Sequence, residues 1–207
     1  MISIILPHLH TSICDESLSL CKRAIASYTS AVYELIIDDT PNKCPYKKYN
    51  EGAKKAKYEI LIFCNTDMIF APGWDIMVKF VEDNVIVMGY LVESGRVGVA
   101  SQNIEKDFGK LPSIFRQQEF EKFCLEHARK NNIPEIKQEM GWYMPCAVNK
   151  KWFLNKGGFD THKKVFPECL DVDYFEKCKK DSRFKLLRAK SYAYHFQALS
   201  NRSQPIK

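Results

Sequence analysis

The sequence predicts an α/β fold in which a twisted, mainly parallel sheet lies between helices. Three short apolar runs, at residues 2–6, 33–37 and 60–63, alternate with two segments of helical spacing. Each run ends in polar residues, as a strand buried on both faces does where it reaches the surface. The order β-α-β-α-β implies parallel strands joined by right-handed crossovers. With 207 residues and 45% apolar composition, one domain is expected.

The composition limits the class of protein. No apolar run approaches the roughly 20 residues that span a bilayer, and residues 1–7 lack the basic start of a signal peptide. We therefore expect a cytoplasmic protein without a transmembrane segment. The formal charge of +6 is spread along the chain, which suits an anionic ligand or a peripheral membrane contact rather than nucleic acid. Eight cysteines without a Cys-x-x-Cys pattern predict buried free thiols, not a zinc cluster or disulfides.

The first half of the chain contains the clearest periodic patterns. Asp15 is a plausible N-cap for a helix through Tyr28, and a second helix is expected around residues 46–56. The lysines of that second helix most simply form a solvated face, and attraction to phosphate or membrane is the alternative. These lysines are Lys47, Lys48, Lys54 and Lys55. Pro72 suits the first turn of a third helix.

The second half is less regular. Residues 85–93 favour a strand but also allow a continued helix, and a strand is expected at 97–101. Ser113 is the expected cap of a helix to about residue 130. A strand-like segment at 141–148 precedes a short helix at 151–155 that Gly157 and Gly158 close. A helix at 172–180 and a strand at 191–196 complete the pattern, and residues 197–207 form a polar tail.

Acidic and amide side chains gather where these elements end. A divalent Mg²⁺ or Mn²⁺ ion binds carboxylate oxygens, accepts an imidazole and keeps positions open for phosphate oxygens. Each residue also has a structural explanation, because Asn and Asp form turns and acids cap helices. No G-x-x-x-x-G-K-[ST] or G-x-G-x-x-G motif is present, so a P-loop enzyme or a classical dinucleotide dehydrogenase is not expected. The residues concerned are Asp38, Asp39, Asn65, Asp67, Glu168, Asp171, Asp173 and His195.

The motifs of the first half resemble those of the GT-A glycosyltransferases of the family 2 type. Residues 2–7, Ile-Ser-Ile-Ile-Leu-Pro, resemble the opening strand of that family, and Leu-Ile-Ile-Asp-Asp at 35–39 resembles its Val-Val-Asp-Asp strand. Thr40 and Pro41 replace the usual Gly-Ser. Asn50-Glu-Gly52 is similar to the family's Asn-x-Gly segment, and Asn65-Thr66-Asp67 stands at its Asp-x-Asp metal motif.

The second half continues the resemblance over some 190 residues. Gly141-Trp142 and the following residues, up to Gly157-Gly-Phe-Asp160, are similar to the family's acceptor-side segment. Leu170-Asp171-Val-Asp173 follows at the spacing of the Glu-Asp-x-Asp motif, and His195 matches a late histidine that completes the metal site.

The resemblance implies an inverting transferase that uses a nucleoside-diphosphate sugar, Mn²⁺ or Mg²⁺, and a glycan or other hydroxyl acceptor. It implies a nucleotide-sugar half at 1–100 and an acceptor half at 101–196. Asp67 and His195 would bind the metal, and Asp171 would be the catalytic base, with Glu168 as a substitute. Asp38 or Asp39 would bind the base, favouring UDP or dTDP. The remaining donor-side residues are Pro7, His8, Asn50, Asn65 and Thr66.

Four alternative interpretations stay open. Trp142 suits stacking on an acceptor sugar, although a core position explains it as well. A nucleotidyltransferase that makes sugar nucleotides shares the architecture, but it would need a Gly-rich phosphate loop after the first strand, where residues 8–12 have none. A non-catalytic module that binds nucleotide sugars or glycans is the third, because Asn65 and Leu170 replace acids of the family motifs. His8 and His10 form a two-ligand metal pattern, but loop residues near the donor pocket are the simpler interpretation.

Overall fold

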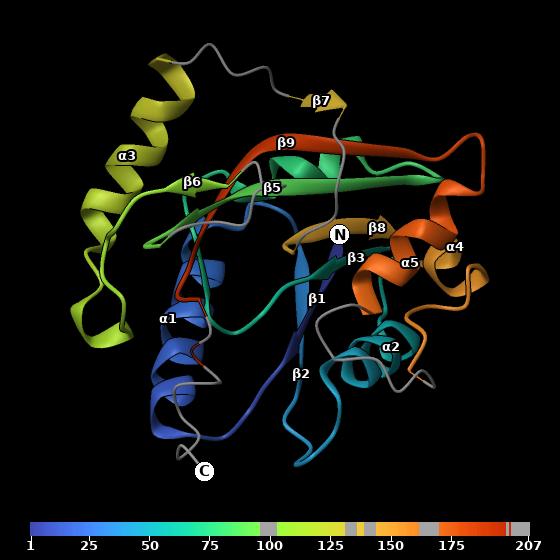
Figure 1. Cartoon of the computed structure of the whole chain (residues 1–207), viewed down its shortest axis with the longest axis horizontal. Helices are drawn as coiled ribbons and strands as arrows, with labels where there is room; N and C mark the ends of the chain where they lie inside the picture. Colours follow the sequence, from blue (N-terminus) through green and yellow to red (C-terminus); the bar gives the residue numbers. More distant parts are fainter. Residues whose placement is uncertain (96–102, 131–135, 139–143, 162–169, 198, 200–207) are drawn as a thin grey trace.

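The computed structural model describes residues 1–95, 103–130, 136–138, 144–161, 170–197 and 199 (Figure 1). Strands and helices alternate in the first part of the chain, and strands dominate the middle. In chain order the elements are β1 (Ile2–Pro7), α1 (Ser12–Tyr28), β2 (Tyr33–Asp38), α2 (Pro45–Lys55), β3 (Ile60–Phe63), β4 (Met68–Phe70), the 3₁₀ helix η1 (Trp74–Phe80), β5 (Val85–Glu93), β6 (Ile104–Glu105), the 3₁₀ helix η2 (Pro112–Ile114), α3 (Gln117–Lys130), β7 (Ile136–Gln138), β8 (Cys146–Asn149), α4 (Lys150–Asn155), α5 (Leu170–Lys179) and β9 (Lys185–His195).

One sheet links the two halves of the chain in the order β2-β1-β3-β8-β5-β9-β4, with β6 beside β5 and β7 beside β9. The predicted parallel pairs β1-β2 and β1-β3 are present, and β5 pairs in parallel with β9. Strands β8, β4 and β7 pair antiparallel with their neighbours. The predicted α/β fold, a sheet flanked by helices, is confirmed.

The order β2-β1-β3 fixes the layers. The chain moves one way from β1 to β2 and the other way from β2 to β3, so right-handed crossovers place α1 and α2 on opposite faces. Figure 1 shows the two helices on either side of β1 and β2. Helix α2 approaches β1 closely at Gly52, where a Cβ atom would lie 2.5 Å from Cγ2 of Ile5. The Asn-x-Gly segment therefore serves close helix–sheet packing.

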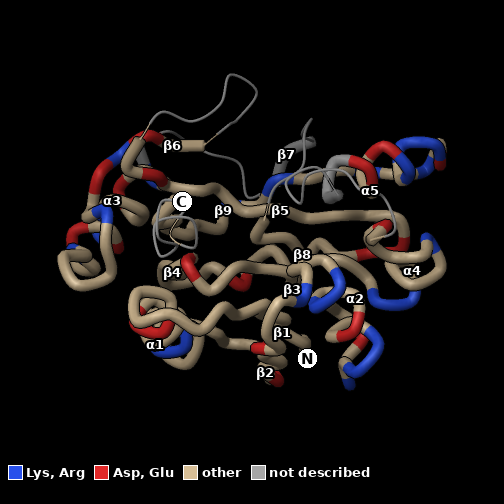
Figure 2. The backbone as a smooth tube through the Cα atoms, turned by 60° about the horizontal axis from the view of Figure 1, so that its bottom comes forward, with Lys and Arg blue, Asp and Glu red and all other residues tan. Residues whose placement is uncertain are grey.

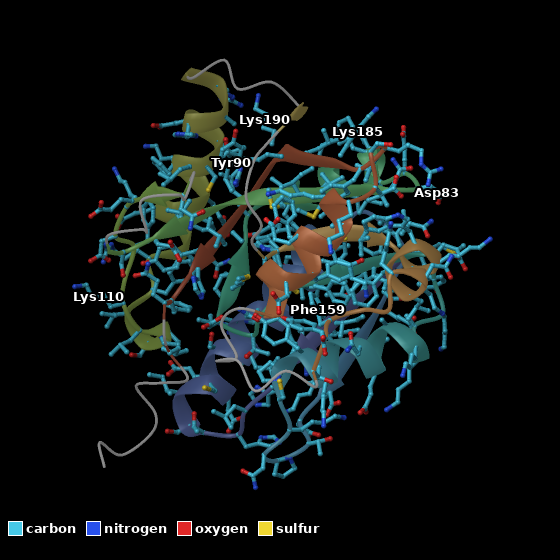
Figure 3. The ribbon with its side chains drawn as sticks, turned by 45° about the vertical axis from the view of Figure 1, so that its right-hand side comes forward. Asp83, Tyr90, Lys110, Phe159, Lys185 and Lys190 are labelled. Carbon is cyan, nitrogen blue, oxygen red and sulfur yellow. The ribbon has the colours of Figure 1, made fainter. Side chains whose placement is uncertain are left out.

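Rings from three elements and from the segment after α4 form a cluster at the carboxyl end of β3. Phe63, the last residue of β3, packs against Phe153 of α4 and against Phe159, with ring centroids 4.7 and 5.5 Å apart. Phe159 also contacts Tyr174 of α5 at 5.2 Å. Figure 3 shows Phe159 between α5 and α2. These contacts hold the first turns of α5 near the end of β3.

Several predicted boundaries are wrong for local reasons. Helix α1 begins at Ser12, and its N-cap is Thr11 rather than Asp15, because the Thr11 side chain accepts a hydrogen bond from the Cys14 amide. Ser113 does not cap a helix to residue 130, since it lies in η2 and α3 begins only at Gln117. The segment after Pro72 is a 3₁₀ helix, and its N-cap Gly73 has φ +76°.

Other expectations are settled by tertiary context. Residues 85–93 form a strand that is buried throughout, because β8 and β9 flank it. The seven described cysteines are free thiols, as predicted, and six of them are buried. The expected strand at 97–101 lies outside the described residues, as does Cys169.

Candidate functional site

The carboxyl ends of three neighbouring strands meet at one edge of the sheet. Strand β1 lies between β2 and β3, and Pro7 at its end is in register with Asp38 at the end of β2. The His8 amide donates to the Asp38 carbonyl at 2.9 Å. The segment Asn65 to Asp67 follows β3 directly. Parallel strands in an open sheet bind ligands at this edge, so the predicted donor-side residues reach the expected part of the fold.

Asp67 faces His195 across the sheet. Strand β4 begins at Met68, whose register partner on β9 is His195. This pairing places Nε2 of His195 3.5 Å from Oδ2 of Asp67, and the Phe196 amide donates to the Asp67 carbonyl at 3.1 Å. The two residues that the resemblance assigns to a metal are thus brought together, although they come from different halves of the chain.

Glu93 completes this group from the other side of the histidine ring. Strand β5 runs beside β9 with Glu93 in register with His195, and Oε1 of Glu93 lies 2.6 Å from Nδ1 of His195. Only 5% of the Glu93 side chain is exposed, and its second oxygen accepts from Asn103 at 2.9 Å. Two carboxylates therefore hold one imidazole between them.

The charges of this group control its protonation. Burial disfavours the imidazolium form of His195, but the carboxylates of Asp67 and Glu93 outweigh burial and raise the pKa of His195 to about 10. Without an ion, the two carboxylates therefore favour a proton on each ring nitrogen, and an ion bound at Nε2 would displace the proton there.

The donor set fits a divalent cation. Oδ1 of Asp67 is buried and has no hydrogen-bond partner among the described residues, which is costly unless a ligand or ion takes it. A carboxylate oxygen and an imidazole nitrogen are ligands that Mn²⁺ accepts. Glu93 on the far nitrogen matches the outer partner that orients metal-binding histidines. Asp67 and His195 would hold the ion, and Glu93 would orient the ring.

The loop between β3 and Asp67 is held by two buried hydroxyl groups. The Tyr49 hydroxyl, on α2, lies 2.6 Å from Oδ1 of Asn65 and 2.9 Å from the Cys64 carbonyl. The Ser17 hydroxyl, on α1, donates to the Thr66 carbonyl at 2.9 Å. Both helices thus fix the loop that presents Asp67, and the Asn65 oxygen already has a partner.

Asp38 and Asp39 have different surroundings. Asp38 accepts from the Lys43 ammonium at 2.6 Å and from the Thr40 amide at 3.0 Å. Burial opposes its ionisation, but these bonds lower the pKa of Asp38 to about 2. Lys43 also pairs with Glu51 of α2. The Asp39 side chain is 63% exposed and lies 3.2 Å from Nε2 of His10.

A hollow of about 190 Å³ lies beside Asp38 and Asp39. It is lined by Ile36, Ile37, Asp38, Asp39, Thr40, Gly52 and Lys55.

A group of two histidines and an aspartate lies beside this edge. His8, His10 and Asp15 place one ligand atom each within 4.8 Å of the others, so they could hold a metal ion. His8 is buried, and its backbone carbonyl accepts from the Lys48 ammonium at 2.7 Å.

One lysine of α2 departs from the predicted solvated face. Lys47, Lys54 and Lys55 are exposed, and Figure 2 shows basic positions along α2 and α4. Lys48 is buried, with 4% exposure, because its ammonium reaches His8, and burial lowers its pKa. The prediction is therefore wrong for Lys48.

Asn50 binds the backbone of Phe159. Its amide nitrogen donates to the Phe159 carbonyl at 2.8 Å, and its amide oxygen accepts from the Phe159 amide at 3.0 Å. Gly158 lies so close to this amide that a Cβ there would be 2.5 Å from Oδ1 of Asn50. Asn50 thus joins α2 to the segment after α4, and its donor-binding role stays a prediction.

The acceptor side is described in part. Asp171 lies in the first turn of α5, but its side chain is outside the description, and Trp142 and Glu168 lie outside the described residues. A hollow of about 380 Å³ borders α5 and is lined by Gly158, Asp160, Asp173, Tyr174, Glu176, Lys177 and Lys180. Neither this hollow nor the one beside Asp38 is lined by Asp67 or His195.

Glu93 was not predicted as a site residue. Its signal in the sequence was an acid at the end of an apolar run, the same signal that pointed to Asp38 and Asp67. The run at 85–93 allowed a helix as well as a strand, so its end could not be placed beside His195. Only the β5-β9 register brings the two together.

Comparisons with known proteins connect this fold to solved structures. Neither a protein-family model nor a curated protein matches the chain. A crystal structure of GalNAc-T7 with UDP, GalNAc and Mn²⁺ matches 94% of this chain with a TM-score of 0.61 and 13% sequence identity. The chain corresponds to 43% of the length of that protein. This likeness shows the fold, which is GT-A-like.

No helix in the described parts of the chain is long and apolar enough to cross a membrane.

Proposed function

We propose that this chain is a metal-dependent glycosyltransferase that takes its sugar from a nucleoside-diphosphate donor. The observation that carries the proposal is the group formed by Asp67, His195 and Glu93 at the binding edge of a GT-A-like sheet. The matched structure contains UDP and Mn²⁺, which supports a donor and an ion of this kind. A bound divalent ion would offset the negative charge that develops on the diphosphate as the glycosidic bond breaks.

The chain's own residues would position the donor. Asp67 and His195 would hold the ion, while Tyr49 and Ser17 fix the loop from Asn65 to Asp67 against both helices. Asp38 stays ionised above about pH 2, and Asp39 is largely exposed. Either carboxylate would accept a hydrogen bond from the N–H of a uracil or thymine base, which favours UDP or dTDP donors.

The chemical step would be an inverting transfer. Asp171 lies in the first turn of α5, and Tyr174 on the next turn packs against Phe159, whose ring contacts Phe63 at the end of β3. A carboxylate at this place would take the proton of the acceptor hydroxyl as that oxygen attacks the anomeric carbon. Trp142 and Glu168 are the proposed acceptor-side residues, with a glycan or another hydroxyl compound as the acceptor. The transferred group would be a hexose or deoxyhexose.

The proposal is tested with a panel of nucleotide sugars. Hydrolysis and transfer are measured with Mn²⁺, with Mg²⁺ and with a chelator, on the parent chain and on Asp67→Ala. We expect turnover of at least one UDP or dTDP sugar that the chelator and Asp67→Ala both abolish. Asp83→Asn is the matched control, because Asp83 is exposed and precedes the start of β5, whereas Glu93 is the last residue of that strand.

The other outcomes separate the alternatives. Metal-dependent binding of a nucleotide sugar without turnover would indicate a binding module. Formation of a nucleotide sugar from a nucleoside triphosphate and a sugar phosphate would indicate a nucleotidyltransferase. Turnover that neither the chelator nor Asp67→Ala reduces would refute the metal site.

A further inference from the structure

A second group of metal-ligand side chains lies on the turn between β1 and α1. His8 and His10 follow β1, and Asp15 lies in the first turn of α1. Nε2 of His8 is 2.7 Å from Oδ1 of Asp15, and Nδ1 of His10 is 3.2 Å from the same oxygen. Two imidazole nitrogens therefore converge on a single carboxylate oxygen.

Local structure produces this convergence. The rings of His8 and His10 meet edge to face, with centroids 4.8 Å apart and planes at 86°. Thr11 fixes the start of α1 by accepting from the Cys14 amide at 3.2 Å, and its carbonyl accepts from the Asp15 amide at 2.8 Å. Asp15 is thus held one turn into the helix, beside the loop that carries both rings.

A fourth residue orients one of the rings. Oδ2 of Asp39, after β2, lies 3.2 Å from Nε2 of His10. A carboxylate on the far nitrogen of a histidine is the usual outer partner of a metal ligand, because it fixes the ring and leaves the near nitrogen free to bind. Without an ion, both nitrogens of His10 must carry protons to serve two carboxylates.

Charge and exposure favour an ion of the zinc type. Asp15 and Asp39 bring two negative charges, which a dication would balance. Two imidazoles and one carboxylate are ligands that suit Zn²⁺ and other first-row transition-metal ions, whereas Mg²⁺ and Ca²⁺ favour sets of oxygen ligands. The side chains of His10 and Asp15 are 60% and 51% exposed, so water can fill the remaining coordination positions.

We propose that His8, His10 and Asp15 form a second divalent-metal site, selective for zinc-type ions, with Asp39 as the residue that orients His10. An ion there would join the turn after β1 to the first turn of α1 and, through Asp39, to the end of β2. The site contains no residue of the Asp67 group, and metal binding there does not depend on the transferase proposal, although Asp39 is also a proposed base-binding residue.

The experiment measures binding of the metal alone to the full-length chain. Asp67→Ala serves as the background, because it removes a ligand of the other group. Zn²⁺ is titrated by calorimetry, and Co²⁺ is added as a spectroscopic probe. We expect one tight ion per chain and a visible Co²⁺ spectrum of four-coordinate nitrogen and oxygen ligands, without a thiolate charge-transfer band.

Matched variants assign the ligands. Asp39→Asn should weaken Zn²⁺ binding by roughly 10- to 100-fold, as loss of an outer partner does. His10→Ala and Asp15→Asn should weaken it further. Both side chains are largely exposed, so these variants should fold, which circular dichroism checks. Glu16→Gln removes an exposed charge beside Asp15 and should leave binding unchanged.

Three results would overturn the site. The first is the absence of stoichiometric Zn²⁺ binding in the Asp67→Ala background. The second is equal binding by His10→Ala, Asp15→Asn and Glu16→Gln. The third is a Co²⁺ spectrum dominated by thiolate ligands, which would place the ion on cysteines. None of these results bears on the transferase assay.

Discussion

Nδ1 of His195 lies 2.6 Å from Oε1 of Glu93, while Nε2 of the same ring faces Asp67 at 3.5 Å. The histidine therefore has one nitrogen for an orienting carboxylate and one for a ligand position. Because Glu93 is buried and also bonded to Asn103, it fixes the ring more firmly than a surface carboxylate would.

Replacing Glu93 by Gln should weaken Mn²⁺ binding by about 10- to 100-fold, because the amide no longer compels Nδ1 to carry the proton. Calorimetry or the electron paramagnetic resonance of free Mn²⁺ gives the affinity. Glu105→Gln, at an exposed position on β6, is the control. Equal affinities for the two variants would mean that Glu93 does not act through His195.

Replacing Asp171 by Asn should abolish transfer but preserve binding of Mn²⁺ and donor. A general base contributes about 10²- to 10⁴-fold, and the amide cannot accept the acceptor's proton. Single-turnover transfer and donor titration separate the two effects. Asp173→Asn, two residues along α5, should change transfer much less. Full activity in Asp171→Asn would show that another residue is the base.

Replacing Asn50 by Ala should lower the free energy of unfolding by about 2 kcal/mol or more, because both backbone groups of the buried Phe159 lose their partner. Urea unfolding measures the change. Asn155→Ala, exposed at the end of α4, should have a small effect. Asn50→Asp keeps the acceptor and loses the donor, so an intermediate loss of unfolding free energy is expected. An unchanged unfolding midpoint in Asn50→Ala would show that Asn50 does not stabilise the fold through Phe159.

Removing the Asp38 charge should reduce stability above pH 4 and alter its acid dependence. The pKa of Asp38 is about 2 in the folded chain and near 4 when unfolded, so its contribution is full above pH 4 and disappears as pH falls towards 2. The contribution is at most about 2 kcal/mol. Unfolding midpoints of the parent and of Asp38→Asn should therefore differ at pH 6 and converge near pH 2. A constant difference would point to a cause other than ionisation.

The parallel core was predictable because its signals are local. Strands β1, β2 and β3 are apolar runs bounded by turn residues, and the helices between them follow their apolar spacing. Strand β4 was missed because three residues carry no period, and its partner β9 lies far along the chain. Strand β9 begins at Lys185, earlier than predicted, since the polar Arg188 is buried and donates to the Gly89 carbonyl.

The candidate site was likewise predictable only where its signals are local. Asp38, Asn65 and Asp67 could be found from the sequence because each ends a strand that the sequence shows. Ligand chemistry grouped His195 with the acidic residues, the family resemblance gave Asp67 and His195 their shared metal role, and Glu93 was not found. Their meeting depends on strand registers, and registers depend on which strands become neighbours.

The separation of Glu93 from His195, 102 residues along the chain, has a consequence for the order of folding. The β1-α1-β2 unit closes local loops, whereas the Asp67 group needs the last strand to insert between β5 and β4. Contacts of such long range form late. Mn²⁺ uptake during refolding should therefore lag behind the recovery of secondary structure, and stopped-flow mixing with the ion would time the closing of the sheet.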